Sequence, residues 1–205
     1  VENDGTAYIG LPDIGVIKYN INTDKVIFLT PNNSIPTIIC NYKENYILLG
    51  TLNRGLFIIN KETGTCERLH IDEQHNSDVY VREIERISDS EYWVGTQSGI
   101  YILKDGITRH IIHEDYNNLS LSDDAIYAIF KDKEDGIWVG SYFGGVDYIP
   151  KQYSSFQNFY PIIYRNSISG YRVREFVSDK HGNLWIATED NGLNYYDTHT
   201  GVFTH

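Results

Sequence analysis

Short apolar runs separated by polar turns recur along the whole chain, and they recur in a fixed internal order. A large apolar residue is followed two positions later by a small one, then by a glycine-containing turn and a second apolar run. Trp occupies the large position in three copies, and other residues occupy it in the first two, which gives the set Tyr8, Leu48, Trp93, Trp138 and Trp185. The small residue lies at positions 10, 50, 95, 140 and 187, so the repeat is 40 to 47 residues long.

A repeat of this length, with several short strands in each copy, is typical of the blades of a β-propeller. The glycine-rich stretch at residues 135–149 could instead be a loop that binds a phosphate group. Such a loop would occur once and precede a helix, whereas this pattern occurs five times and no helical periodicity follows it. Ile137, Trp138 and Val139 are consecutive apolar residues, which fits a strand buried on both faces between neighbouring sheets. We therefore expect the tryptophans to be core residues, and the small residue to let the next sheet approach closely.

Each complete copy predicts four strands, named here a to d in chain order, and strand b carries the Trp position. Turns such as residues 20–25 and 60–65 are rich in the residue types that reverse the chain. We expect strand a at 36–41, 81–87, 125–131 and 172–178, and strand d at 25–30, 66–71, 108–114, 156–160 and 202–204. The blades then cover about 1–30, 36–71, 81–114, 125–160 and 172–205, with nineteen strands.

The predicted fold class is therefore all-β, a β-propeller of four-stranded antiparallel blades. The first copy has no strand a, so we expect residues 1–205 to be about five blades of a larger ring, seven-bladed in the complete protein. Open strand edges and uncovered apolar faces at the two ends predict self-association of the isolated piece.

Composition narrows the functional classes. The chain has 205 residues and a net charge of −11, with only 17 Lys and Arg, so it lacks the basic surface that nucleic acid requires. No apolar run is long enough for a spanning helix.

Cys40 falls on strand a and Cys66 on strand d of one blade, about 14 Å apart at the usual strand spacing. That separation exceeds the reach of a disulfide, so two free thiols are expected.

Candidate binding residues gather where loops differ between copies, because binding residues commonly lie on variable loops held by a constant scaffold. The b–c and d–a loops emerge at one end of the predicted ring. Tyr142 and Phe143 replace the polar b–c residues of other copies, and Glu189 and Asp190 are acidic b–c residues. Exposed aromatic rings could stack on a sugar while acids bind its hydroxyl groups. Packing of Tyr142 and Phe143 against a neighbouring loop is the alternative.

The predicted innermost strands carry charges that must be paired or hydrated. Arg82-Glu83 and Arg174-Glu175 occupy equivalent positions, where the copy between them has Tyr127. Arg82 and Arg174, joined by Arg172, could bind an anionic or polyhydroxylated ligand. The alternative is mutual salt-bridging across a water-filled channel.

Catalytic and metal chemistry find little support. His110 and His113 lie three apart on a predicted strand and would point to opposite faces. No spacing of His or Cys matches a metal site, and we expect no metal, no cofactor and no catalytic residue. Asp123-Asp124 and Glu189-Asp190 could be imagined as glycosidase carboxylates, although solvation explains acidic pairs in polar loops equally well.

Residues 121–149 (LSDDAIYAIFKDKEDGIWVGSYFGGVDYI) and 167–204 (SISGYRVREFVSDKHGNLWIATEDNGLNYYDTHTGVFT) closely resemble the repeats of two-component-regulator propellers. Leu48 and Tyr8 in place of Trp, and Ala187 in place of Gly, depart from the repeat. The resemblance implies the periplasmic sensor of a hybrid two-component histidine kinase from Bacteroides-type bacteria. Such sensors work as homodimers, respond to oligosaccharides from glycans, and meet the membrane only through segments outside this sequence.

Three functions follow from the sequence. The first is a non-catalytic ligand-sensing domain that binds a glycan-derived oligosaccharide and signals through rearrangement of a dimer. The second is a propeller enzyme, a lyase or glycosidase, which would need an acid–base pair at the mouth of the channel. The third is a protein-interaction scaffold that uses the same loop face. Calorimetry against oligosaccharides separates the first from the third, and recovery of unaltered sugar excludes the second.

Overall fold

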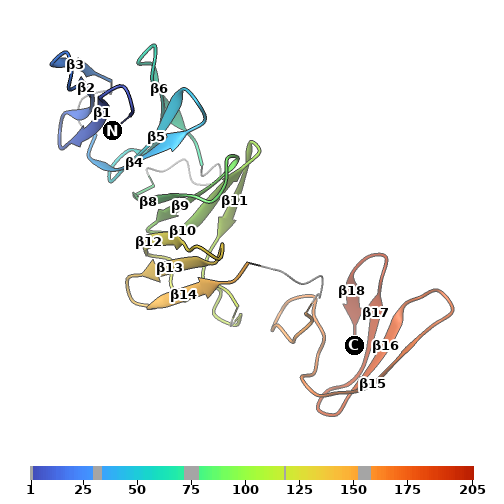
Figure 1. The fold of residues 1–205 in the computed structure, drawn as a ribbon. Helices are drawn as coiled ribbons and strands as arrows, with labels where there is room; N and C mark the ends of the chain where they lie inside the picture. The colour runs from blue at the N-terminus through green and yellow to red at the C-terminus, as the bar shows by residue number, and fades with distance from the viewer. Residues whose placement is uncertain (1, 30–33, 72–78, 118, 152–157) are drawn as a thin grey trace. The chain divides into compact units, whose positions relative to one another are not determined.

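The computed structural model describes residues 2–29, 34–71, 79–117, 119–151 and 158–205. These residues form eighteen strands in five antiparallel sheets (Figure 1). Within each sheet the strands lie side by side in chain order, as in a meander. These antiparallel sheets of short strands confirm the predicted all-β propeller fold. The described part of the chain contains no helix long and apolar enough to cross a membrane.

The chain divides into two compact units. Unit 1 comprises residues 1–113 and 119–151, and unit 2 comprises residues 114–118 and 152–205. Unit 1 contains four sheets. Sheet 1 consists of β1 (Thr6–Leu11), β2 (Gly15–Asn20) and β3 (Lys25–Phe28), and sheet 2 consists of β4 (Pro36–Tyr42), β5 (Tyr46–Thr51), β6 (Gly55–Asn60) and β7 (Cys66–Leu69). Sheet 3 consists of β8 (Val81–Arg86), β9 (Glu91–Thr96), β10 (Gly99–Lys104) and β11 (Ile107–Ile111), and sheet 4 consists of β12 (Ile126–Lys131), β13 (Ile137–Ser141) and β14 (Val146–Ile149). Unit 2 holds sheet 5, with β15 (Val173–Ser178), β16 (Leu184–Thr188), β17 (Gly192–Asp197) and β18 (Val202–Thr204).

Four of the five predicted strands d differ from the structure by two residues or more. Those expected at 25–30 and 66–71 end earlier, at Phe28 and Leu69. The strand expected at 156–160 is not found at residues 158–160, and residues 156–157 lie outside the described residues. The strand expected at 108–114 spans Ile107–Ile111, so His113 lies in the loop that follows it. His113 leaves the strand because its backbone N–H donates to Asp124 Oδ1 (2.6 Å) and its ring bonds to the carbonyl of Leu121 (2.6 Å). The predicted free thiols of Cys40 and Cys66 are confirmed.

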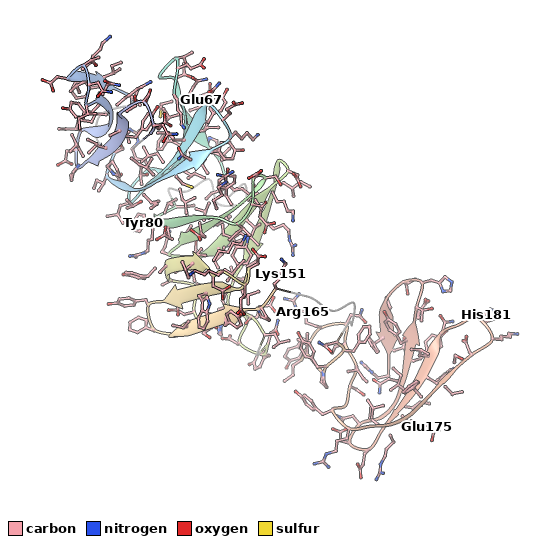
Figure 2. All side chains as sticks on the ribbon, in the orientation of Figure 1. Glu67, Tyr80, Lys151, Arg165, Glu175 and His181 are labelled. Carbon is pink, nitrogen blue, oxygen red and sulfur yellow. The ribbon has the colours of Figure 1, made fainter. Side chains whose placement is uncertain are left out.

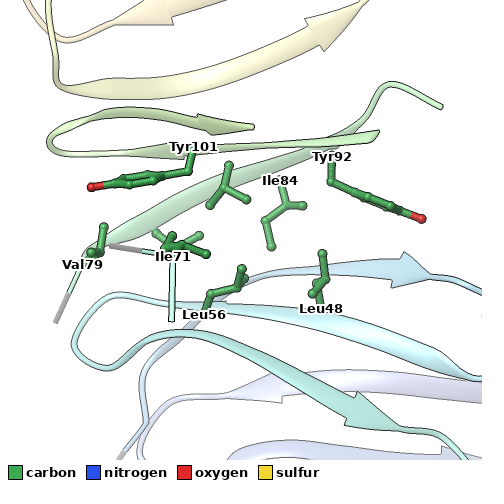
Figure 3. Close-up of a cluster of buried hydrophobic side chains, with 9 residues drawn as sticks. Leu48, Leu56, Ile71, Val79, Ile84, Tyr92 and Tyr101 are labelled. Atoms are coloured by element: carbon green, nitrogen blue, oxygen red, sulfur yellow. The ribbon is translucent and has the colours of Figure 1, made fainter. Parts of the chain in front are cut away.

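Three clusters of buried side chains join the four sheets of unit 1. Alternate residues of one strand belong to different clusters, because successive side chains point to opposite faces of a sheet. In β5, Leu48 packs toward sheet 3, while Ile47 and Leu49 pack toward sheet 1. In β9, Tyr92 and Val94 face sheet 2, and Figure 3 shows the cluster that they form there. Strands buried on both faces explain the continuous apolar runs of the sequence.

The small residue of the repeat lies where adjacent sheets come closest. A Cβ atom added to Gly50 would lie 2.5 Å from Val81 Cγ1 of the next sheet, and one added to Gly95 would lie 2.9 Å from Ile126 Cγ2. Both distances are shorter than van der Waals contact allows. At Gly140, in contrast, the nearest atom is Ala128 Cβ of the same sheet, at 3.7 Å. The expected close approach of the next sheet is therefore confirmed at Gly50 and Gly95.

The Thr that follows the small residue shapes the turn between the second and third strands of a sheet. Thr51 Oγ1 donates to the carbonyl of Gly55 (2.7 Å), and Thr96 Oγ1 donates to that of Gly99 (2.8 Å). Each glycine has a positive φ, 78° at Gly55 and 102° at Gly99, a conformation that other residues rarely adopt. These contacts make the turns alike in backbone while leaving the turn side chains free to differ.

Trp93 and Trp138 differ in what covers them within unit 1. Trp93 is 6% exposed and packs in the cluster between sheets 3 and 4. Trp138 is 44% exposed on the other face of sheet 4, where its ring lies 4.5 Å from that of Tyr148 and its Nε1 donates to Asp132 Oδ2 (2.8 Å). Phe130 lies beside Trp138 in register and is 61% exposed. Within unit 1, this face of sheet 4 is therefore apolar and no other sheet of the unit packs on it.

Replacement of Trp93 by Ala should lower the free energy of unfolding by about 3–5 kcal/mol, because it empties a buried site between two sheets. Phe28→Ala is the control and should cost clearly less, since the Phe28 side chain on β3 is 70% exposed. Chemical denaturation of the two variants measures the difference. Equal losses would contradict the assignment of Trp93 to the core.

Gly50→Ala should destabilise the chain by about 1–3 kcal/mol, because the added methyl group overlaps Val81 and forces the sheets apart. Gly95→Ala, where the added methyl group would lie 2.9 Å from Ile126 Cγ2, should destabilise in the same way. Thermal unfolding followed by circular dichroism measures both. A change of less than about 0.5 kcal/mol in both variants would show that adjacent sheets do not meet at the small residue.

Candidate ligand-binding site

The first strand of each four-strand repeat contains a β-bulge at the same place. The register with the neighbouring strand shifts between Pro36 and Ile38 in β4, and between Val81 and Glu83 in β8. The same shift occurs in β12 and in β15, so the four bulged residues are Thr37, Arg82, Tyr127 and Arg174. A bulge redirects the side chain of its extra residue and is common beside binding sites.

In unit 1 the bulged strands β4, β8 and β12 lie next to one another. Thr37 Oγ1 donates to the carbonyl of Val81, the residue before Arg82 (2.7 Å). The Arg82 Cζ atom lies 4.1 Å from the centroid of the Tyr127 ring. The bulges therefore form a continuous row along the first strands.

An aromatic group extends this row onto the turn between β13 and β14. The Tyr127 and Tyr142 rings are stacked, with centroids 5.3 Å apart and an angle of 21°. Phe143 meets Tyr142 edge-on at 4.3 Å. The exposed fractions are 45% for Tyr127, 58% for Tyr142 and 86% for Phe143. Arg82, Tyr127, Tyr142 and Phe143, named together below as the Arg82 cluster, thus combine three exposed aromatic rings with a half-buried arginine.

Backbone contacts hold the turn that carries Tyr142 and Phe143. The N–H of Tyr142 donates to the carbonyl of Ala125 (2.9 Å). The Asp123 carboxylate accepts from the backbone N–H of Phe143 (2.9 Å) and from that of Ala125 (3.2 Å). These backbone donors hold the pKa of Asp123 below its ordinary value of 3.8. Asp123 therefore ties the turn to the segment before β12 and fixes the position of both aromatic side chains.

The charge of Arg82 is not neutralised by the acid beside it in the sequence. Arg82 forms no ion pair with a described residue, and its Nε is buried without a hydrogen-bond partner among them. Glu83 instead accepts from the backbone N–H of Ile84 (3.0 Å), and burial raises the pKa of its carboxyl. Stacking on Tyr127 leaves the guanidinium with hydrogen bonds still to make, as a group prepared for a ligand would have.

The remaining predicted residues gather in unit 2. Arg174 Nη2 lies 3.0 Å from Glu189 Oε1, so the bulged arginine pairs with the turn of its own sheet. The Asp190 carboxylate accepts from the backbone N–H of Tyr171 (3.1 Å) and of Arg172 (3.4 Å), and its pKa is lowered by these bonds. Asp190 therefore orders the segment before β15, as Asp123 orders the turn of sheet 4. Figure 2 shows Glu175, next to Arg174, and His181 at the β15–β16 turn.

The structure thus brings the eight predicted residues into two groups, four in each unit. Sequence reasoning did not identify the bulges, because the pattern of apolar residues carries no signal for an extra residue in a strand. It did note Asp123-Asp124 and Asp190. All three carboxylates accept hydrogen bonds from backbone N–H groups, which gives them a structural role.

Metal ligands do not gather in the part of the chain that is described. No three His, Cys, Asp or Glu side chains among those residues lie close enough to hold an ion. The His110 ring stacks on Tyr101 at 4.0 Å, and its Nε2 lies 2.6 Å from the Ser98 carbonyl oxygen.

Comparisons with known proteins address the repeat and the fold. The model of the two component regulator propeller family matches residues 120–143, which include Asp123, Tyr127, Tyr142 and Phe143. None of the curated proteins compared with the chain matches it significantly.

Among solved structures, the extracellular domain described as that of the hybrid two component system BT3049 from B. thetaiotaomicron is 23% identical over 99% of this chain, with a TM-score of 0.64. This chain spans 32% of that one. The dihydro-heme d1 dehydrogenase NirN is 12% identical; the match covers 98% of this chain and 44% of that one, with a TM-score of 0.53. The designed protein Ika8 is 16% identical; the match covers 94% of this chain and 55% of that one, with a TM-score of 0.52.

At these identities the likeness to solved structures concerns the fold, whereas the family match concerns the repeat itself. The match covers the end of the segment before β12, both strands of the first hairpin of sheet 4 and the turn that carries the aromatic residues. The resemblance predicted from the sequence is therefore confirmed, and residues 120–143 match the two component regulator propeller repeat.

Proposed function

We propose that this chain is part of the ligand-sensing domain of a hybrid two-component sensor histidine kinase, located outside the cytoplasm in the periplasm. The family match and the likeness to an extracellular domain of such a system support this proposal. The chain spans 32% of that structure. The kinase, the membrane segment and the signalling partner are therefore proposed for the whole protein and not for this chain.

The ligand proposed is an oligosaccharide derived from a glycan, bound at the Arg82 cluster. The single observation that carries this is a stacked, solvent-exposed aromatic pair, Tyr127 and Tyr142, beside a guanidinium group without an acid partner among the described residues. Aromatic faces stack on the apolar face of a sugar ring, while a guanidinium donates to hydroxyl or acidic substituents. The turn is held by Asp123, so the site is ordered before the ligand binds.

Binding without catalysis agrees with how the carboxylates near the cluster are used. Asp123 and Asp124 both accept backbone hydrogen bonds, so neither offers the free acid–base pair that a glycosidase requires. A sensor needs only a ligand that binds one arrangement of the protein more tightly than another. We infer that the two arrangements are those of a homodimer, which light scattering and small-angle X-ray scattering with and without the sugar would distinguish.

Tyr142→Ala should weaken oligosaccharide binding about five- to tenfold or more, because one stacking surface is lost. Its melting temperature should stay nearly unchanged, since the ring is mostly exposed. Phe28→Ala, which removes a similarly exposed aromatic ring from β3, is the control and should leave affinity unchanged. Calorimetry against a panel of oligosaccharides, followed by chromatography of the recovered sugar, makes the measurement.

Three results would contradict the proposal. The first is the absence of heat from every sugar in the panel, and the second is full affinity in Tyr142→Ala. Cleavage of the bound sugar would show instead that the chain is part of an enzyme.

Asp123→Ala should reduce the same affinity, although Asp123 need not touch the ligand, because the turn loses the acceptor for two backbone N–H groups. The pH dependence has a defined sign. The folded-state pKa of Asp123 is lowered, so the hydrogen bonds are intact above pH 3.8 and are lost as the pH falls through the folded-state pKa below it. The amide chemical shift of Phe143 in an NMR titration reports this, and a transition above pH 3.8 would show that Asp123 does not hold the turn.

A further inference from the structure

The position of the Arg82 guanidinium depends on few contacts of its own. Its Nε is buried without a hydrogen-bond partner among the described residues, and the group forms no ion pair with any of them. Its aromatic contact is with Tyr127, whose ring centroid lies 4.1 Å from Arg82 Cζ. Attraction to the face of a ring draws a cation toward the ring but sets no single hydrogen-bond geometry. The direction in which the side chain leaves β8 therefore decides where the guanidinium lies.

The backbone at Arg82 is not held by a regular strand ladder. Val81 pairs with Thr96 and Glu83 pairs with Gly95, so Arg82 is the extra residue of the β8 bulge and has no partner in this register. A bulge disrupts the ladder locally, and the neighbouring strand holds the peptide there less firmly than in a regular pair. Because a peptide group is planar, the orientation of the Val81 carbonyl also sets that of the Arg82 N–H. Whatever holds this carbonyl thus directs the Arg82 side chain.

The Val81 carbonyl is held from the neighbouring sheet. Thr37 Oγ1, on β4 of sheet 2, donates to it at 2.7 Å. Thr37 is itself the extra residue of the β4 bulge, which redirects its side chain out of the regular alternation of that strand. A β-branched side chain has restricted χ1 rotamers, so the hydroxyl approaches the carbonyl in a defined direction. Sheet 2 therefore holds the peptide from which the Arg82 side chain of sheet 3 begins.

We propose that Thr37 is a positioning residue of the oligosaccharide site, although it need not touch the sugar. Its hydrogen bond fixes the peptide before Arg82 and so keeps the guanidinium over the Tyr127 ring before the sugar binds. This inference rests on the proposed function of the Arg82 cluster. It makes the site depend on three sheets, because Thr37 of sheet 2 acts through Arg82 of sheet 3 on the aromatic rings of sheet 4.

Thr37→Val removes the hydroxyl and keeps the shape of the side chain, whereas Thr37→Ser keeps the hydroxyl and is the matched control. The Arg82 side chain is followed by NMR without any sugar, because the ring current of Tyr127 shifts the resonances of protons that lie over the ring. These resonances are assigned by their absence from the spectrum of Arg82→Lys. Thr37→Val should move them toward their positions in Tyr127→Leu, which has no aromatic ring at this place. Thr37→Ser should leave them where they are in the unchanged chain.

Calorimetry with the oligosaccharide of the panel that binds the unchanged chain most tightly measures the effect on the site. Thr37→Val should weaken binding about three- to tenfold, as expected for the loss of one hydrogen bond, and Thr37→Ser should bind as the unchanged chain does. Both variants should keep their melting temperature, because Thr37 lies at an exposed position of β4.

Unmoved Arg82 resonances in Thr37→Val, or equal changes in Thr37→Ser, would overturn the inference. Moved resonances with full affinity would overturn it as well, since the site would then not depend on where Arg82 lies. The resonances are recorded without sugar, so they still decide whether Thr37 positions Arg82 if no sugar of the panel binds, a result that contradicts the proposed function instead.

Discussion

One contact determines the architecture of unit 1. A glycine on the second strand of one sheet packs against the first strand of the next sheet. Gly50 lies against Val81 and Gly95 against Ile126, at distances that leave no room for a methyl group. This contact brings β4, β8 and β12 next to one another. It also buries both faces of β5 and β9, and so creates the clusters that hold the sheets together.

Because the first strands are adjacent, their bulges become adjacent as well. One backbone irregularity repeated in each copy gives a row of side chains with defined spacing, and the identity of each side chain is then free to vary. Thr37 uses its position for a contact between sheets, whereas Arg82 and Tyr127 stack on each other. Arg174, at the equivalent position of unit 2, pairs with Glu189 of its own sheet. The same scaffold therefore supports both structural contacts and a candidate site.

The two ends of the sheets in unit 1 differ in their chemistry. At the end with the β13–β14 turn, exposed aromatic rings lie beside the half-buried Arg82, and Asp123 accepts hydrogen bonds from the backbone of this turn. At the other end, turns that look like simple chain reversals in the sequence surround a cavity into which the buried core extends. Tyr92 belongs both to the core cluster and to the lining of this cavity. Its hydroxyl has no hydrogen-bond partner among the described residues.

The sequence by itself determined the repeat, the strand order within each sheet and the role of the small residue, because these depend on periodicity and on local turn chemistry. It also identified Arg82, Tyr127, Tyr142 and Phe143, although as separate candidates. Only the tertiary structure decided that these four residues contact one another, since a bulge and a contact between sheets leave no periodic signal. It likewise decided that Trp93 is buried, because that depends on sheet 4 covering this face of sheet 3 and not on the strand that carries the residue.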